Sequence, residues 1–275
     1  MKSVCKSVVA GTFYPADPQE LSKLISLYLS EVDLKLPEFN DILGVIAPHA
    51  GYIYSGACAA YSYKAISNKD FKLAVIIAPS HQYGDFYYSV GDYDACATPL
   101  GEVEVDRELT SKLLNDSKFV FFPYAHSREH SLEVQLPFLQ TIKPDIKILP
   151  IIIGYQYAQS SLYLSDKLAE LLKDHLNETI IIISSDLSHY HDHKKAESMD
   201  KTFADAVEKI DTESVKTLLA EKKSEACGFG GILTLMQLAR KLKYNRAKTL
   251  HYTHSGETSG DYNHVVGYLS TMFYR

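Results

Sequence analysis

Three short apolar runs in this 275-residue chain each break off into a turn of small residues that carries a histidine. The runs cover residues 43–47, 73–78 and 179–183, and the histidines that follow them are His49, His81 and His189. Such runs, rich in β-branched residues and bounded by Pro, Gly or Ser, are typical of strands buried on both faces of a parallel sheet. Open α/β sheets bind ligands beyond the carboxyl ends of their strands. The pattern therefore predicts a sheet edge at which three imidazoles converge.

Helical spacing of apolar residues alternates with these runs. We expect a helix opened by Asp17 and Pro18, and strands at 146–153 and 264–273, with short strands within 86–97. Further helices are expected at 55–66, 106–114, 127–142, 160–176, 194–207, 212–221 and 232–242. This order predicts an α/β fold with a mixed, mostly parallel central sheet and helices on both faces. No Pro/Gly/Ser-rich linker interrupts the chain, so residues 1–275 are expected to form a single domain.

Composition excludes several classes of protein. The formal net charge of −6 offers no positive surface for nucleic acid. No apolar segment approaches the ~18 residues of a membrane helix, and the first residues do not resemble a signal peptide, so a cytoplasmic protein is expected. The four cysteines lack C-x-x-C spacing, which argues against a zinc ribbon or a disulfide framework.

A metal site is the simplest use of converging imidazoles, because neutral imidazole is the commonest metal ligand in proteins. Two histidines need at least one more ligand to hold a transition metal firmly. Cys227 precedes the helix expected at 232–242, and a thiol near a helix N-terminus is stabilised as thiolate. His49, His81 and Cys227 are therefore the candidate ligands. A small cysteine packed beneath a glycine-rich turn remains an open alternative for Cys227.

Two further positions are candidates for acid–base chemistry. Asp186 and His189 lie three residues apart, so both can face one site if a turn follows the strand. A carboxylate beside an imidazole suits proton transfer or the orientation of a metal ligand. Asp186 could instead cap the following helix. His130 opens a helix with Glu133 three residues on, which is a helix-start pattern, although His130 can still point into the cleft.

Six ordered segments resemble the Memo family, and the resemblance covers essentially the whole chain. These segments are residues 8–15, 47–52, 79–81, 129–133, 184–189 and 227–228. The resemblance implies the fold of class III, LigB-type extradiol dioxygenases, with His49, His81 and Cys227 as metal ligands and Asp186 and His189 beside them. The dioxygenases hold ferrous iron with two histidines and a carboxylate. A cysteine in the third position suits copper or zinc at least as well as iron.

The leading hypothesis is a copper- or iron-dependent redox enzyme, with zinc as a further possible metal, in which His189 moves protons and Asp186 orients it. A non-catalytic adaptor that binds a peptide or protein in the same cleft is the alternative; within or directly beside the motif segments there is a single arginine, Arg128. A cysteine hydrolase built on Cys227 leaves His49 and His81 without a task. The resemblance also implies radical-SAM and AMMECR-type proteins as partners. The substrate is left open.

Overall fold

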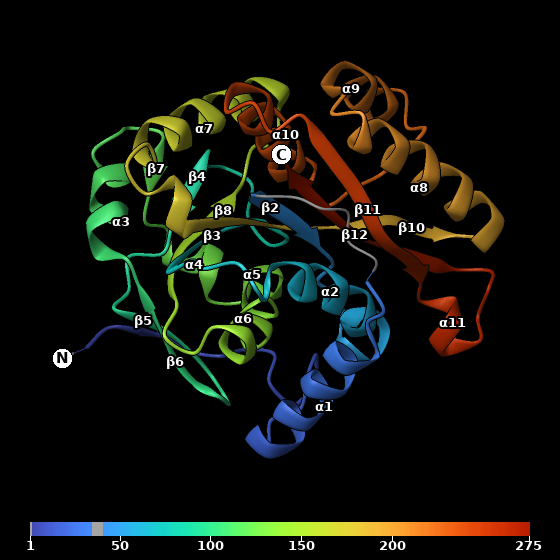
Figure 1. Ribbon diagram of the computed structural model, residues 1–275, viewed down its shortest axis with the longest axis horizontal. Coiled ribbons are helices and arrows are strands. Elements are labelled where there is room, and N and C mark those ends of the chain that lie inside the picture. Colours follow the sequence, from blue (N-terminus) through green and yellow to red (C-terminus); the bar gives the residue numbers. More distant parts are fainter. Residues whose placement is uncertain (1, 35–40) are drawn as a thin grey trace.

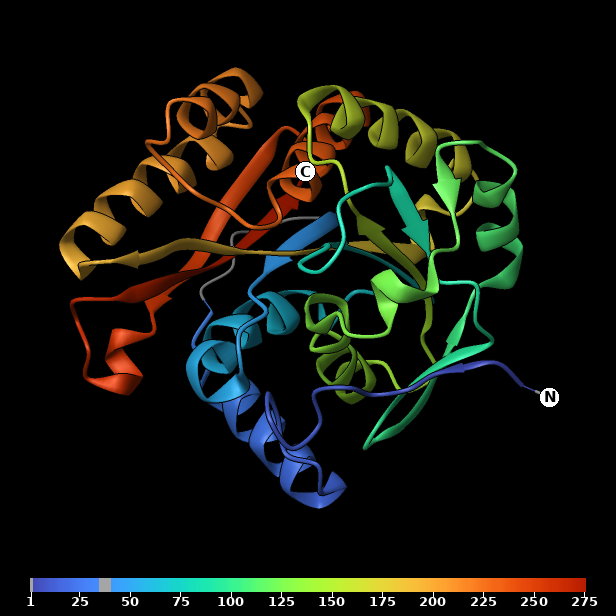
Figure 2. The same ribbon diagram turned by 180° about the vertical axis from the view of Figure 1, so that it is seen from behind.

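A large mixed sheet forms the centre of the molecule, with helices on both of its faces (Figures 1 and 2). The computed structural model describes residues 2–34 and 41–275, and within these residues the sheet has twelve strands. They are β1 (Val4–Cys5), β2 (Ile42–Ala47), β3 (Leu73–Pro79), β4 (Tyr88–Val90), β5 (Ala95–Thr98), β6 (Gly101–Val105), β7 (Phe119–Val120), β8 (Lys147–Ile153), β9 (Thr179–Ser184), β10 (Asp186–His191), β11 (Arg246–His254) and β12 (Val265–Tyr274).

The spatial order of the sheet is β1-β5-β6-β8-β3-β9-β2-β12-β10, with β11 paired to β12, and β4 paired to β7 and β8. The central strands β6, β8, β3, β9 and β2 are parallel to one another. Antiparallel pairs flank this centre, β5 with β6 on one side and β12 with β2 on the other. The α/β fold with a mixed, mostly parallel central sheet is thus confirmed.

The three apolar runs are neighbours in this sheet, because β9 pairs with β3 on one side and with β2 on the other. All three strands run in the same direction, so their carboxyl ends meet at one edge. The residues that follow β2 and β3 are the turns that carry His49 and His81. The topology therefore creates the predicted edge for His49 and His81, whereas His189, the third histidine of the pattern, lies within β10 rather than in a turn after β9.

Alternate residues of the central strands enter two separate cores, one on each face of the sheet. Val75 and Ile77 of β3 join one cluster with Leu164, while Ala74 and Ile76 join another with Ile25. Fully burying an aliphatic side chain of this size contributes about 1.5–3 kcal/mol to stability, so both faces matter to the fold. This two-sided burial explains why the strands read as unbroken apolar runs.

The helices cover these two cores. They are α1 (Pro18–Glu31), α2 (Tyr52–Ile66), α3 (Arg107–Leu114), α4 (Pro123–His126), α5 (His130–Glu133), α6 (Leu136–Ile142), α7 (Ala158–Leu171), α8 (His193–Glu208), α9 (Thr212–Ala220), α10 (Phe229–Lys241) and α11 (Gly256–Ser259), with a 3-10 turn at Leu176–Glu178. Helices α1, α2 and α6 cover one face, and α7 and α10 cover the other (Figure 1). Among the described residues, no helix is long and apolar enough to span a membrane.

The start of α1 shows how local sequence sets an element. The side chain of Asp17 accepts hydrogen bonds of 2.9 Å from the backbone N–H groups of Gln19 and Glu20. Pro18 occupies the first helical turn, where its missing N–H has no helical partner to lose. The helix expected from Asp17 and Pro18 is confirmed.

One expected helix is divided. The segment 127–142 forms α5 and α6 with a break between them rather than one helix. Pro137 explains the break, because proline donates no hydrogen bond to the preceding turn and its ring clashes with that turn's carbonyl. It is accommodated in the first turn of α6. The break places His130 at the start of its own short helix, facing the sheet edge.

Candidate metal centre

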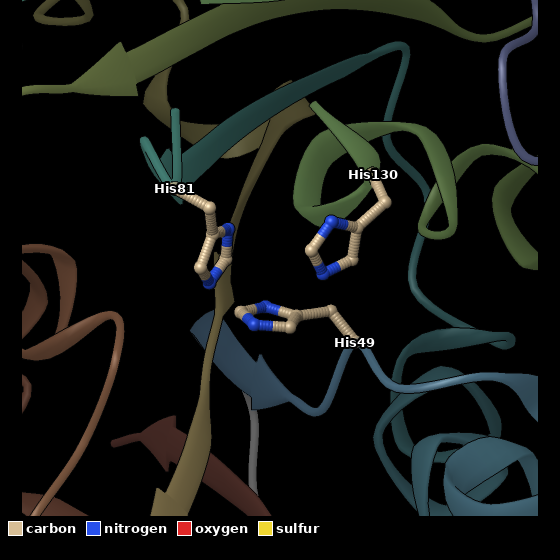
Figure 3. Close-up of side chains that lie close together, drawn as sticks. All are labelled: His49, His81 and His130. Atoms are coloured by element: carbon tan, nitrogen blue, oxygen red, sulfur yellow. The ribbon is translucent and has the colours of Figure 1, made fainter. Parts of the chain in front are cut away.

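Three histidines from different parts of the chain meet at the carboxyl edge of the sheet (Figure 3). His49 follows β2, His81 follows β3, and His130 begins α5. One ring nitrogen from each lies within 4.8 Å of the other two. The ring centroids of His81 and His130 are 4.7 Å apart, and those of His49 and His81 are 5.2 Å apart. This spacing would allow the three rings to hold one metal ion.

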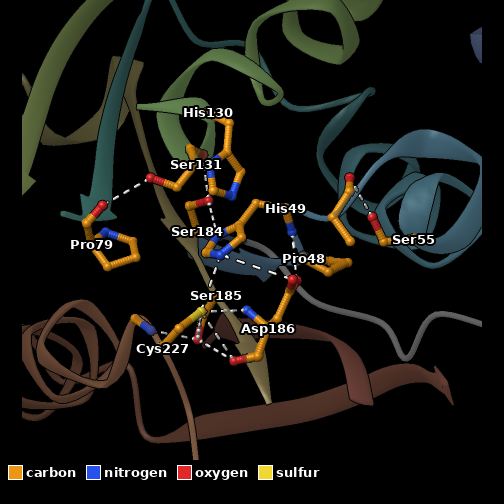
Figure 4. A network of polar contacts seen from close by, with 12 residues as sticks. Pro48, His49, Ser55, Pro79, His130, Ser131, Ser184, Ser185, Asp186 and Cys227 are labelled. Carbon is orange, nitrogen blue, oxygen red and sulfur yellow. Dashed lines mark hydrogen bonds and ion pairs between the residues drawn. The ribbon is translucent and has the colours of Figure 1, made fainter. Parts of the chain in front are cut away.

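The ring of His49 is fixed by a chain of hydrogen bonds beneath it (Figure 4). Its Nδ1 lies 2.8 Å from the hydroxyl of Ser184, which in turn donates its proton to the carbonyl of Ser131 at 2.6 Å. Because that hydroxyl has only one proton, its oxygen accepts a hydrogen bond from His49 Nδ1–H. The lone pair of His49 is therefore on Nε2, which faces away from Ser184 and towards the cluster.

His81 is held in the same tautomer by a buried carboxylate. Oε1 of Glu129 lies 2.8 Å from Nδ1 of His81, and Oε2 accepts the backbone N–H of His81 at 2.7 Å. An ionised carboxylate can only accept, so Nδ1 of His81 donates to it, and in the neutral ring the lone pair is on Nε2. The same Oε1 lies 3.5 Å from Nδ1 of His130. Carboxylates in this position orient metal-binding histidines in many proteins.

Electrostatics keep two of the three imidazoles neutral. Burial, together with repulsion from the neighbouring histidines, lowers the pKa of His49 to about 3 and that of His130 to about 4. Burial opposes the charge on Glu129, but the hydrogen bond and positive charge of His81 outweigh it and hold the pKa of Glu129 at about 2. That partnership also raises the pKa of His81 despite its burial. Neutral imidazole is the form that binds metals, so His49 and His130 suit a cation, whereas His81 would have to lose its second ring proton to bind one.

Cys227 lies on the other side of His49 from Ser184. Its Sγ is 3.1 Å from Nε2 of His49 and 3.1 Å from the backbone nitrogen of Asp186, which donates to it. Gly228 permits this approach, because a Cβ there would lie 2.3 Å from the carbonyl oxygen of Ser184. Cys227 thus contacts His49, but among the described residues the ligand atoms that lie within 4.8 Å of one another belong to His49, His81 and His130.

The thiol of Cys227 differs electrostatically from the sequence-based expectation. Burial, reinforced by the negative charge of Asp186, raises the pKa of Cys227 well above its ordinary value. These effects outweigh the helix start at Phe229, so the thiol is neutral and can donate to Nε2 of His49. Metal binding would have to displace this proton, because the thiolate is the form that ligates metals.

Asp186 and His189 have separate partners. Oδ1 of Asp186 accepts the backbone N–H of His49 at 2.7 Å, whereas Nδ1 of His189 lies 2.7 Å from the carbonyl of Leu187. The sequence-based hypothesis had Asp186 orienting His189, on the assumption of a turn after β9. The chain instead continues into β10, whose pairing with β12 is irregular between these two residues. The carboxylate consequently holds the turn of His49, and the Leu187 carbonyl orients His189.

The structure brings His49 and His81 together, as the sequence pattern suggests, and adds His130 to them. Cys227 adjoins the group through His49. The local signal for His130 was its place at a helix opening with Glu133 three residues on, a pattern that also fits an ordinary helix start. Only the three-dimensional contact between Glu129 and His81 distinguishes the two interpretations.

A protein family described as Memo-like protein matches residues 6–272 of this chain. The chain belongs to the Memo family. A MEMO1 family protein of Nitrosopumilus maritimus is 38% identical to this chain over 98% of each chain. A MEMO1 family protein of Aquifex aeolicus is 36% identical to it, over 98% of this chain and 99% of the relative.

A solved structure of an uncharacterized protein from Escherichia coli K12, JW3007, resembles this Memo-family chain with a TM-score of 0.50. The match covers 85% of this chain and all of that one, at 11% sequence identity. At this identity the likeness shows a shared fold alone. Function has to be argued from the site.

Proposed function

We propose that this Memo-family protein is a metal-dependent redox enzyme that binds copper or iron at His49 and His81. The observation that carries the proposal is the orientation of these two rings. Hydrogen bonds to Ser184 and Glu129 occupy both Nδ1 atoms, so a metal would bind at the two Nε2 atoms and would displace the proton of the Cys227 thiol that faces His49. Histidine ligands in metalloproteins are typically held in this way, by an acceptor on the nitrogen that does not bind the metal.

The neighbouring donors favour a transition metal. His130 would supply a third imidazole and Cys227 a soft sulfur donor, and sites with both kinds of donor suit copper, zinc or iron. A hard cation such as magnesium prefers oxygen ligands, which makes it a poor match. Bound copper or iron would supply one-electron chemistry, which these side chains cannot provide themselves.

The remaining residues would handle protons and shape. His189 donates Nδ1–H to the Leu187 carbonyl, so its Nε2 can accept a proton from a substrate. Its backbone N–H donates to Glu225 at 3.0 Å, which fixes the position of the residue. Asp186 is buried and accepts the backbone N–H of His49, so it maintains the turn rather than moving protons.

Metal analysis of untagged protein tests the binding step. Wild-type protein should carry about one equivalent of a transition metal, and a His49→Ala, His81→Ala double variant should carry none above background. His175→Ala is the matched control, because the side chain of His175 is 43% exposed and, among the described residues, its ion pair is with Glu178. Equal metal content in the double variant and wild type would overturn the proposal.

The choice of third ligand is tested by His130→Ala and Cys227→Ser. The variant that removes a true ligand should lower metal affinity at least tenfold. The redox step is tested separately with an oxygen electrode and ascorbate as electron donor. Oxygen uptake should require the bound metal and should fall in His189→Gln without loss of metal. Uptake that persists in metal-free protein would exclude the redox role.

Radical-SAM and AMMECR-type partners remain a prediction. Co-purification of the three proteins expressed together, with the His49→Ala, His81→Ala variant in parallel, would show whether such a complex forms and whether the site is needed for it.

A further inference from the structure

A cavity of about 850 Å³ lies against Cys227 and His189, and none of the three clustered histidines lines it. Its walls come from the start of α7, from β10, from α9 and from the segment that leads into α10. Cys227 contacts both sides, because its Sγ lies 3.1 Å from Nε2 of His49 while the residue lines the cavity. The cavity and the candidate metal centre are therefore next to each other, with Cys227 between them.

Most of the wall is apolar. Leu187 of β10, Leu219 of α9, and Phe229 and Leu233 of α10 all line the cavity. A volume of this size is in the range of pockets that enclose a small organic molecule, and such pockets are mainly hydrophobic with a few polar groups. The cavity thus suits a ligand with an apolar body.

Several polar groups in the wall are already paired within the protein. The amide of Gln156 donates to the carbonyl of Cys227 at 2.7 Å and accepts the backbone N–H of Gly230 at 2.9 Å. Glu225 accepts from His191 at 3.0 Å and from the backbone of His189. Because Gln156 and Glu225 already have hydrogen-bond partners within the protein, a ligand does not have to supply them.

Two lysines line this cavity together with the carboxylate of Glu225. Lys216 comes from α9 and pairs with the exposed Glu213, whereas Lys222 follows α9 in its C-terminal turn. Lys222 has no ion-pair partner among the described residues. Because the charge of Lys222 is uncompensated, an acidic group on a ligand would be its natural counterpart.

The backbone at Lys222 is unusual for a lysine. Its φ is 55°, in the left-handed region where the residue after a helix is most often glycine. Its N–H donates to the carbonyl of Leu219 at 3.1 Å, which closes the end of α9. A side chain in this conformation costs about 1 kcal/mol relative to glycine. The strained position sets its side chain beside the cavity.

We infer that this cavity is the substrate pocket of the protein, and that its ligand is a small organic acid with an apolar body. This inference rests on the proposed function, because it names the class of molecule that would reach Cys227 and His189. The apolar part would lie against Leu187, Phe229 and Leu233, and the acidic group would pair with Lys222.

A pair of fluorescent probes tests the inference directly. 8-Anilinonaphthalene-1-sulfonate has an apolar aromatic body and an anionic group, and N-phenyl-1-naphthylamine has the same body without the charge. Both should bind folded protein at one site. Ala220→Trp, on the exposed end of α9, should fill the cavity and weaken both probes at least tenfold. Lys222→Gln should weaken only the sulfonate, by about three- to tenfold.

Lys223→Gln is the matched control, because Lys223 is the next residue, is exposed, and pairs with Glu221 outside the cavity. It should leave both affinities unchanged. Bound sulfonate should also slow modification of Cys227 by N-ethylmaleimide, measured by mass spectrometry, without slowing that of Cys5. Equal binding in wild type and Ala220→Trp, or equal effects of the two lysine variants, would overturn the inference. Probe binding needs no metal, so a failure of the proposed metal function would leave this result intact.

Discussion

The hydroxyl of Ser184 lies 2.8 Å from Nδ1 of His49, and the two residues stand at the ends of neighbouring parallel strands. The pairing of Ala47 with Ser184 in the sheet sets this distance, because His49 is only two residues beyond Ala47. Ser184 also accepts a hydrogen bond from the Gln135 amide at 2.9 Å. The register of the sheet thus determines that Nδ1 of His49 donates to Ser184 and that Nε2 is the nitrogen available to a metal.

Replacing Ser184 by alanine should therefore weaken metal binding without removing a ligand. The loss of the acceptor frees the His49 ring to rotate and to change tautomer, and such losses typically lower metal affinity 10- to 100-fold. Metal affinity is measured by competition with a chromophoric chelator. The control is Ser165→Ala, since Ser165 is equally buried but bonds only within α7. Unchanged affinity in Ser184→Ala would refute the tautomer argument.

Glu129 and Glu133 offer a matched pair of buried carboxylates four residues apart. Glu129→Gln should lower metal affinity about tenfold, because an amide puts no negative charge beside Nδ1 of His81. Glu133→Gln should leave metal affinity unchanged and instead reduce stability, since Glu133 accepts the hydroxyl of Ser7 at 2.9 Å and the N–H of Val8 at 2.7 Å.

Urea unfolding and chelator competition on both glutamine variants separate the two roles. An equal loss of metal affinity in Glu133→Gln would show that general loosening of the site, rather than the contact with His81, explains the result.

The strand-end histidines could be predicted because their signal is local. An apolar run on a buried strand is recognisable alone, and parallel strands have to end at one edge, so His49 and His81 followed from sequence. Strand β11 could not be predicted in the same way. It contains polar residues such as Arg246, Lys248 and His251 and no apolar run, and it is defined by its pairing with β12 rather than by its own sequence.

The partners of Asp186 and His130 could not be predicted for a related reason. Asp186 lies 137 positions from His49 in sequence, and their contact depends on the register of β2 with β9. His130 joins the cluster because Glu129 pairs with His81, which is a tertiary contact. Local sequence identifies side chains that can do chemistry, but packing decides which of them meet.

Gly228 should tolerate no side chain. In Gly228→Ala the new Cβ would meet the carbonyl oxygen of Ser184 at 2.3 Å and Cβ of Ser185 at 2.8 Å. Backbone must move to relieve this contact, so we expect a loss of about 2–4 kcal/mol in the free energy of unfolding. Gly84→Ala is the control, because a Cβ there meets nothing within 4 Å. Similar unfolding free energies for the two variants would contradict the packing argument.

His126 should make the stability of the protein depend on pH. Burial lowers the pKa of His126 to about 4, and its Nε2 lies 2.9 Å from the hydroxyl of Ser89. An unfolded histidine has a pKa near 6.5, so below that pH His126 binds a proton in the unfolded chain but not in the folded protein. The contribution of His126 is therefore fully present above about pH 6.5 and is lost as the pH falls towards 4, by up to about 3 kcal/mol.

Urea unfolding of wild type and His126→Gln between pH 7.5 and 4.5 measures this contribution, because glutamine keeps a hydrogen-bonding group without a proton to gain. The advantage of wild type over the variant should shrink steadily below about pH 6.5. His175→Gln serves as the control, because 43% of the His175 side chain is exposed and it lacks the full burial of His126. A constant difference for His126→Gln would mean that the folded protein accepts the proton at position 126. Acid would then weaken the protein through other groups, and the burial of His126 would not be the cause.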